Sequence, residues 1–251
     1  MKINKLVLLR HGESQWNLEN RFTGWTDVGL TKNGENEARN AGNLLAKSNI
    51  QIDLAYVSKL KRAIRTHKIC VNQLKKSSLD TIYSWRLNER HYGSLQGLNK
   101  SQTAQKYGDE QVLLWRRSYD IPPPSMGCHD KRHPKNDVLY KHIDPQKLPS
   151  SESLKDTLER VMPLWKNQII SKIKSGNNII IVAHGNSLRA IVKILKKINK
   201  KDIVNLNIPT GVPYIFDLNN KLEAINDYFL GNQDEILKKI KDVSNQGLSK
   251  D

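Results

Sequence analysis

The stretch LVLLRHGESQWN, residues 6–17, begins with four consecutive apolar residues and then becomes abruptly polar at Arg10 and His11. A second stretch, IIIVAHGNS, residues 179–187, has the same form: four apolar residues, one further residue, and then His-Gly-x-Ser around His184. Short continuous apolar runs are typical of strands that are buried on both faces of a sheet. Ligands bind at the carboxyl ends of parallel strands, so the two stretches predict two imidazoles in one crevice if their strands are neighbours.

The rest of the chain alternates apolar runs with helical patterns. Strands are expected at residues 6–9, 54–58, 177–184 and, as the last strand, 211–219, with an extended segment at 80–87. Helices are expected at residues 32–49, 59–74, 153–174 and 186–198, the third of them kinked at Pro163. This alternation predicts an α/β fold of three layers, with a mostly parallel sheet and helices on both of its faces.

The domain organisation is expected to be simple. No linker divides the chain, so a single catalytic domain is predicted over residues 1–230, followed by a C-terminal tail over residues 231–251. The proline-rich segment from Tyr119 to Asp137 is predicted to be a long loop. Loops of that length in compact domains often serve as lids or binding walls.

Composition narrows the class of protein. The chain has 251 residues, 37% of them hydrophobic, and no apolar run approaches the roughly 20 residues that span a bilayer. Arg10 and His11 interrupt the N-terminal apolar run too early for a signal peptide, so a cytoplasmic protein is expected. The two cysteines, Cys70 and Cys128, are expected to be free thiols in a reducing compartment.

The formal net charge of +16 raises the question of a polyanionic partner. The basic residues are mostly scattered lysines without a nucleic-acid recognition motif, so neither a nucleic acid nor a membrane is predicted as a partner. Cys128, His129 and His133 lie close together in the sequence, but prolines flank them and no second cluster completes a site. No metal site is therefore predicted.

Two histidines beside an arginine, without cysteine thiolates or clustered metal carboxylates, suit phosphoryl transfer through a phosphohistidine. A neutral imidazole is a competent nucleophile near neutral pH, because its ordinary pKa is about 6.5. Nearby cations favour that neutral form and also stabilise the charge on phosphoryl oxygens. Arg10, directly before His11, is placed where a phosphate would bind.

Eight segments together resemble the histidine phosphatase superfamily and, within it, the cofactor-dependent phosphoglycerate mutases. They are RHGESQWN (10–17), FTGWTDVGLT (22–31), KRAIRT (61–66), ERHYGSLQGLNK (89–100), WRRSYDIPPP (115–124), PSSESLKDTLERVMP (149–163), VAHGNSLRAI (182–191) and NIPTGVPYIF (207–216). The first segment indicates the superfamily, and the middle segments narrow the likeness to the mutases. The resemblance extends over roughly residues 4–231.

The resemblance implies catalytic roles for five residues. His11 would carry the phosphoryl group between half-reactions, and His184 would hydrogen-bond and stabilise that group during transfer. Arg10 and Arg62 would clamp the phosphoryl oxygens. Glu89 would be the general acid and base, because a mutase must deprotonate one substrate hydroxyl and protonate another.

The resemblance also implies a set of substrate and phosphate contacts. These are Ser14, Asn17, Thr23, Gly24, Arg90, His91, Tyr92, Lys100, Arg116, Arg117, Gly185 and Asn186. The pair Arg116–Arg117 suits a second anionic group, because the planar guanidinium binds carboxylate and phosphate in a bidentate manner. The implied substrates are 3-phosphoglycerate and 2-phosphoglycerate, with 2,3-bisphosphoglycerate as the priming phosphoryl donor and no metal. A homo-oligomer, dimer or tetramer, is implied, with the tail closing over the site.

Three alternatives remain open at this point. A bisphosphoglycerate mutase or phosphatase would use the same site, although family members of that kind tend to carry glycine where this chain has Ser14. A broad-specificity histidine phosphatase would not need Lys100, Arg116 and Arg117. A catalytically inactive binding protein is disfavoured by the presence of His11, Glu89 and His184 together.

Overall fold

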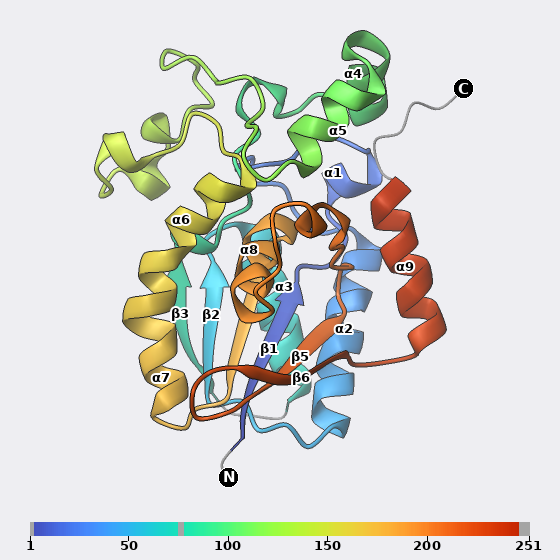
Figure 1. The fold of residues 1–251 in the computed structure, drawn as a ribbon, viewed down its shortest axis with the longest axis vertical. Coiled ribbons are helices and arrows are strands. Elements are labelled where there is room, and N and C mark those ends of the chain that lie inside the picture. The colour runs from blue at the N-terminus through green and yellow to red at the C-terminus, as the bar shows by residue number, and fades with distance from the viewer. Residues whose placement is uncertain (1–2, 75–77, 246–251) are drawn as a thin grey trace.

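A six-stranded sheet forms the centre of the molecule, with the strand order β3-β2-β4-β1-β5-β6 (Figure 1). The computed structural model describes residues 3–74 and 78–245. The strands are β1 (Asn4–Arg10), β2 (Leu54–Ser58), β3 (Asp80–Ser84), β4 (Ile179–Ala183), β5 (Pro213–Leu218) and β6 (Ala224–Phe229). The first four are parallel to one another, whereas β5 and β6 are antiparallel to their neighbours, so the sheet is mostly parallel as predicted.

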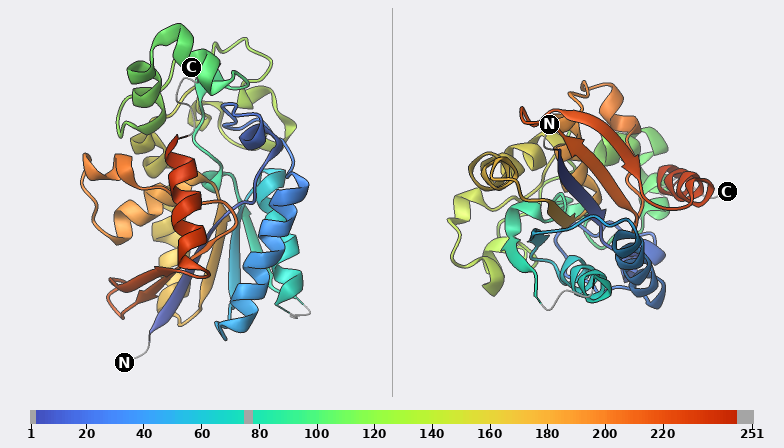
Figure 2. Two further views of the ribbon diagram at one scale, coloured as in Figure 1. Left: turned by 90° about the vertical axis from the view of Figure 1, so that its right-hand side faces the viewer. Right: turned by 90° about the horizontal axis from the view of Figure 1, so that it is seen from below.

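Helices cover both faces of the sheet, which confirms the predicted three-layer α/β fold. They are α1 (Gln15–Leu18), α2 (Lys32–Lys47), α3 (Lys61–Gln73), α4 (Lys100–Tyr107), α5 (Asp109–Arg117), α6 (Leu154–Leu164), α7 (Ile170–Lys174), α8 (Gly185–Leu195) and α9 (Gln233–Asn245). Helices α2 and α3 lie on one face, and α6, α7 and α8 on the other (Figure 2). Within the described ranges, no helix is long and apolar enough to cross a membrane.

The apolar run of β1 is continuous because both faces of this strand are buried. Leu6 and Leu8 pack in the core beneath α6 and α8, while Val7 and Leu9 pack in the core beneath α2 and α3. All four side chains have no exposed surface. Burial of two apolar side chains on each face favours a place for this strand at the centre of the sheet.

The two strands with matching ends are neighbours. β1 pairs with β4 in parallel, with Leu9 opposite Val182 and Arg10 opposite Ala183. The backbone N–H of His11 continues the ladder by donating to the carbonyl of Ala183 at 3.0 Å. The register therefore brings His11 and His184 to the same edge of the sheet, as the sequence predicted.

Two expectations about elements need correction. The strand predicted to be the last is followed by β6, an edge strand with a half-exposed pattern that shows little apolar alternation. The single helix expected at residues 153–174 is divided: α6 is followed by a π-helical turn at Trp165–Ile169 and then by α7. Pro163 lacks the N–H that a regular helix needs, and the π-helical turn begins shortly after it.

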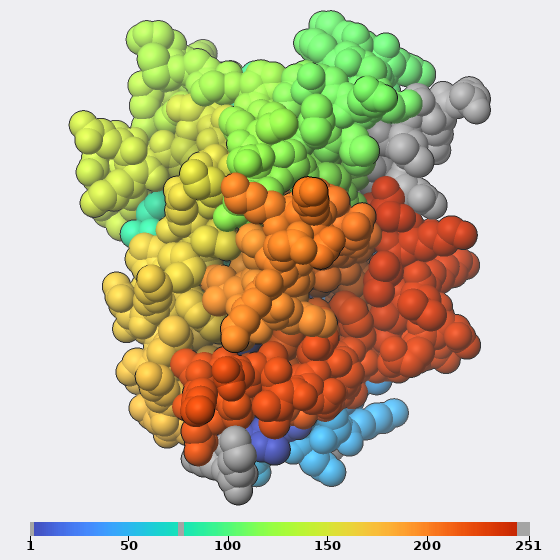
Figure 3. All heavy atoms as spheres, in the orientation of Figure 1, coloured from blue at the N-terminus to red at the C-terminus, as the bar shows by residue number. Residues whose placement is uncertain are grey.

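Above the carboxyl ends of the strands lies the long segment between β3 and α6. It contains α4 and α5, which were not predicted, and the irregular stretch at residues 119–137, which was predicted as a loop. In Figure 3 this segment, green to yellow-green, covers the top of the molecule. Helix α9 occupies part of the predicted tail, and residues 246–251 of that tail lie outside the described residues.

Candidate active site

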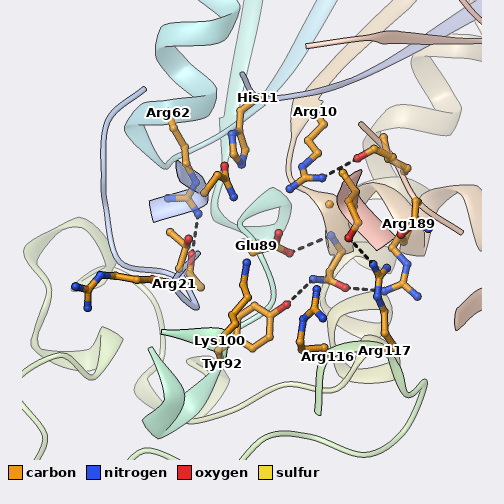
Figure 4. A pocket seen from close by; sticks show the side chains of 18 residues that line it. Arg10, His11, Arg21, Arg62, Glu89, Tyr92, Lys100, Arg116, Arg117 and Arg189 are labelled. Carbon is orange, nitrogen blue, oxygen red and sulfur yellow. Dashed lines mark hydrogen bonds between the residues drawn. The ribbon is translucent and has the colours of Figure 1, made fainter. Parts of the chain in front are cut away.

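A polar pocket lies between the carboxyl ends of the central strands and the segment above them (Figure 4). Its walls are formed by Arg10, His11, Asn17, Arg21, Thr23, Gly24, Arg62, Glu89, Tyr92, Lys100, Arg116, Arg117, Gly185, Asn186, Arg189, Asn207, Ile208 and Val243. Six of these are arginines, half of the twelve in the chain. Such a concentration of guanidinium groups favours an anionic ligand with more than one charged group.

His11 is held in one tautomer by its own loop. Its Nδ1 lies 2.7 Å from the carbonyl oxygen of Gly12, which can only accept, so Nδ1 carries the hydrogen and Nε2 keeps a free lone pair. Gly12 has to be a glycine, because an added Cβ would lie 2.1 Å from the carbonyl oxygen of Gly34. Burial, Arg62 and Arg10 hold the pKa of His11 well below its ordinary value. The ring is therefore neutral at neutral pH, with the Nε2 lone pair that a nucleophile needs.

His184 lies beside His11, with 4.9 Å between the ring centroids. Its Nε2 is 2.8 Å from the hydroxyl of Ser58, and that hydroxyl donates to Asn88 Oδ1 at 2.9 Å, so Nε2 is the donor. Nδ1 has no hydrogen-bond partner within the described parts of the chain, although it is buried. Burial and Arg62 lower the pKa of His184 well below its ordinary value. An arriving phosphoryl group would oppose that shift, because a nearby negative charge favours the protonated ring.

Two buried guanidinium groups flank the histidines, and backbone carbonyls hold both of them. Arg10 donates to the carbonyl of Ile208 at 2.8 Å, and Arg62 donates to the carbonyls of Gly24 and Thr26 at 2.8 and 3.0 Å. Neither forms an ion pair with a carboxylate among residues 3–74 and 78–245. Burial lowers the pKa of Arg62 to about 10. A buried cation that only carbonyls hold is stabilised by an incoming anion.

Glu89 lies across the pocket from His11 (Figure 4). Its Oε1 accepts the backbone N–H groups of Arg90 at 2.8 Å and of Asn186 at 3.0 Å. Its own carbonyl accepts from Trp25 Nε1 at 2.6 Å and from Arg160 at 3.1 Å. The carboxylate is therefore fixed in orientation by the backbone, as an acid–base group needs to be.

The outer end of the pocket carries a second group of cations, Lys100, Arg116 and Arg117, from α4 and α5. Burial, with Arg116 and Arg10 nearby, holds the pKa of Lys100 well below its ordinary value. Burial and Arg116 lower the pKa of Arg117 to about 10. Arg117 also donates to the carbonyl of Val243 on α9 at 3.2 Å. Burial is the larger cause of these lowered pKa values and repulsion between the cations adds to it, and a bound anion would offset both effects.

Thirteen of the predicted site residues line this pocket, and four do not: Ser14, Arg90, His91 and His184. Ser14 caps α1 in a reciprocal arrangement with Asn17. Arg90 is fully buried, with its guanidinium 4.7 Å from the ring centre of Tyr92, and donates to the carbonyl of Arg116 at 2.6 Å. Ser14 and Arg90 therefore support neighbouring parts of the site. Their roles as substrate contacts stay predictions.

Five pocket residues were not predicted: Arg21, Arg189, Asn207, Ile208 and Val243. Arg189 is buried and donates to Asn186 Oδ1 at 2.9 Å and to the carbonyl of Ile203 at 2.6 Å, and burial lowers its pKa to about 9. The guanidinium of Arg21 points away from the other labelled side chains (Figure 4). Arg189, Asn207 and Ile208 lie within two of the quoted sequence segments, which could have revealed them. Val243 reaches the pocket only through the packing of α9.

The described residues contain no group of three or more His, Cys, Asp or Glu side chains that could hold a metal ion. In the Cys128–His129–His133 segment, the His133 Nε2 is 2.9 Å from the Ser150 hydroxyl. Cys128 is exposed and Cys70 is buried, and both are free thiols.

Comparison with known protein families shows to which family this chain belongs. The family model for the histidine phosphatase superfamily (branch 1) matches residues 6–135 and 128–229, which together span most of the chain. This chain belongs to the histidine phosphatase superfamily.

Curated relatives give a finer likeness. A protein of Parabacteroides distasonis named 2,3-bisphosphoglycerate-dependent phosphoglycerate mutase is 53% identical over 248 residues, covering 99% of this chain and all of the relative. A protein of Bacteroides fragilis with the same name has the same identity and coverage. The chain therefore belongs to the phosphoglycerate mutase family, which confirms the resemblance drawn from the eight segments.

Solved structures agree on the fold. A structure titled mycobacterial hydrolase 1 has a TM-score of 0.69 at 22% identity and covers 91% of this chain and 97% of its own. A mycobacterial glucosyl-3-phosphoglycerate phosphatase with bound vanadate has a TM-score of 0.68 at 23% identity, covering 90% of this chain and 97% of its own. At that identity the likeness concerns the architecture of the sheet and its helices.

Proposed function

We propose that this protein interconverts 3-phosphoglycerate and 2-phosphoglycerate through a phosphohistidine at His11. The observation that carries the proposal is the arrangement around that ring. Nε2 is free, two buried guanidiniums that carbonyls hold stand beside it, and a backbone-held carboxylate, Glu89, lies across the pocket. The names of the relatives that match along the whole chain support the same reaction.

In the transfer step, His11 Nε2 attacks the phosphorus atom, forming an N–P bond as the O–P bond to the leaving oxygen breaks. Arg10 and Arg62 stabilise the charge on the equatorial oxygens, where most of the catalysis of phosphoryl transfer arises. Glu89 gives a proton to the leaving oxygen in one direction and removes it from the attacking hydroxyl in the other. In its protonated form, which a bound phosphoryl anion favours, His184 donates from Nδ1.

The outer cations explain how a substrate with two anionic ends is held. When one phosphoryl group lies against His11, Lys100, Arg116 and Arg117 are available to the carboxylate or the other phosphate. Because both ends of the pocket bind anions, a bisphosphorylated intermediate can turn and present its other phosphoryl group to His11. The residues present therefore fit 2,3-bisphosphoglycerate, which supplies the first phosphoryl group when bound.

The proposal also covers the location, assembly, metal use and partners of the protein. We propose a cytoplasmic homo-oligomer, dimer or tetramer, that uses no metal and takes neither nucleic acid nor membrane as a partner. The described part of the tail supports a place over the active site, because the carbonyl of Val243 on α9 accepts from Arg117 in the pocket. A bisphosphoglycerate phosphatase is the second candidate, since water could accept the phosphoryl group from the same His11.

The test measures conversion of 3-phosphoglycerate to 2-phosphoglycerate by the purified protein, with and without 2,3-bisphosphoglycerate and with EDTA throughout. Strong activation by the bisphosphate, unaffected by EDTA, is expected. Steady phosphate release that exceeds mutase turnover would favour the phosphatase. Loss of activity in EDTA, restored by a divalent cation, would contradict the metal-free reaction.

A further inference from the structure

Glu37, on α2, lies behind the pocket and takes no part in its lining. Its side chain is only 10% exposed, yet its carboxylate receives three hydrogen bonds from three different segments. The donors are the backbone N–H of Glu13 at 2.7 Å, the hydroxyl of Thr210 at 3.1 Å and the ammonium of Lys239 at 2.7 Å. The reaction steps above make no use of this carboxylate.

Each of those three segments contains or contacts a residue that the proposed reaction uses. Glu13 follows His11 in the loop that leaves β1. Thr210 lies in the loop before β5, whose Ile208 carbonyl accepts from Arg10 at 2.8 Å. Lys239 is on α9, which also presents the Val243 carbonyl to Arg117. The Glu37 carboxylate therefore links three segments that each contribute a residue to the pocket lining.

The packing around Glu37 leaves these loops little freedom. An added Cβ on Gly211, which has a φ of +64°, would lie 2.4 Å from the Cβ of Glu37. The backbone N–H of Gly211 in turn donates to the carbonyl of Arg10 at 3.0 Å. An added Cβ on Gly34, one turn earlier on α2, would lie 2.0 Å from the carbonyl oxygen of Glu13. Helix α2 therefore approaches both loops closely at glycines, and neither loop can move toward the helix without a clash.

We propose that Glu37 is a positioning residue for phosphoryl transfer. It holds the loop that follows His11 and the loop that orients Arg10 at a fixed separation, and Lys239 balances its charge from α9. This inference rests on the proposed function, because it concerns transfer to His11. A displacement of about 1 Å at a reacting group can lower a rate about a hundredfold, so the loss of this link is expected to slow the chemistry.

The test compares three variants that separate geometry from charge. Glu37→Ala removes the acceptor, Glu37→Asp keeps the charge but shortens the reach, and Glu37→Gln keeps the shape and one acceptor oxygen. We expect Glu37→Ala and Glu37→Asp to lower the rate of His11 phosphorylation by about tenfold to a hundredfold with little change in KM for 3-phosphoglycerate. Glu37→Gln should recover the rate to within a few-fold of the unmodified protein.

The measurement is quenched-flow formation of acid-labile phosphohistidine from 2,3-bisphosphoglycerate, together with kcat and KM. The matched control is Glu35→Ala, on the same helix, where the carboxylate pairs with the exposed Arg65 at 2.7 Å. It should phosphorylate at the normal rate. Thermal unfolding of each variant separates a slower reaction from a loss of folded protein.

Normal phosphorylation in both Glu37→Ala and Glu37→Asp would overturn this inference alone. A slow Glu37→Gln beside a normal Glu37→Asp would also overturn it, because charge and not position would then matter. If the unmodified protein forms no phosphohistidine, the proposed function fails and this inference fails with it.

Discussion

The inner and outer ends of the pocket are built in different ways. At the inner end, Arg10 and His11 continue β1 at the centre of the sheet, and the ladder with β4 fixes their backbone. At the outer end, Arg116 and Arg117 stand on α5, which packs through Val112 in a small apolar cluster away from the sheet and is joined to the site by side-chain hydrogen bonds to backbone carbonyls. In the proposed reaction, the inner end holds the groups that make and break bonds, and the outer end holds groups that need only to bind charge.

Removal of the His11 imidazole is expected to have the largest effect and tests this division most directly. His11→Ala is expected to abolish phosphohistidine formation and to bring mutase turnover to the limit of detection, because no other described imidazole has the same free Nε2 beside Arg10 and Arg62. Acid-labile phosphate and turnover are measured. Binding of 3-phosphoglycerate, followed by calorimetry, should stay within a few-fold of normal, since the outer end is unchanged. Residual phosphohistidine in this variant would move the nucleophile elsewhere.

The second largest effect is expected at Glu89. Glu89→Gln keeps the size of the side chain but removes its ability to exchange a proton, so kcat should fall by about a hundredfold to ten-thousandfold. Steady-state kinetics with 3-phosphoglycerate measures the change, and KM should change much less than kcat. Near-normal kcat would remove Glu89 from the acid–base role.

At the outer end, the expected effect is smaller and concerns binding. Arg117→Ala should raise KM by about tenfold to a hundredfold with a lesser change in kcat, because a hydrogen bond to a charged group contributes about 1.5–3 kcal/mol. The same assay with Arg65→Ala, an exposed arginine on α3, is the matched control and should show no change. A fall in kcat as large as that of Glu89→Gln would contradict the division between the two ends.

The smallest effect concerns stability against pH. Burial lowers the pKa of His67 to about 4, whereas the unfolded chain protonates this ring near pH 6.5. Between those values the unfolded state binds the extra proton, so the free energy of unfolding falls as the pH is lowered from about 6.5 toward 4. At pH 5 the loss is about 2 kcal/mol for this ring.

Urea unfolding of the unmodified protein and of His67→Gln at pH 7.5 and pH 5 measures that loss. The decrease in the free energy of unfolding should be about 2 kcal/mol smaller in the variant, since glutamine takes up no proton. Equal decreases in the two proteins would show that the ring is protonated in the folded state as readily as in the unfolded state. The buried imidazoles of His11 and His184 add to the same dependence, because their pKa values are also lowered.

The inner end could be predicted from the sequence because strands buried on both faces have an unmistakable pattern. The runs before His11 and His184 are apolar throughout, and their matching ends led to the expectation of neighbouring strands, which the register confirms. The assignment of Glu89, by contrast, came from the family likeness, since its charged loop has no periodic pattern of its own.

Features set by tertiary contacts could not be predicted. The half-exposed edge strand β6 has no clear apolar alternation, and α4 and α5 are short helices with few buried residues. Val243 reaches the pocket through its carbonyl, a group that every residue carries, so its identity gives no signal. Glu37 resembles any charged residue on a helix face until its three donors are seen in space.

The strand order has a consequence for synthesis on the ribosome. β4 lies between β2 and β1, but it is made long after both of them. Until β4 has left the exit tunnel, β1 and β2 have unpaired edges with apolar side chains, the kind of surface that attracts chaperones or other nascent chains. The reactive pocket is therefore among the last parts of the molecule to form, and a chain released before β4 cannot bring an imidazole partner to His11.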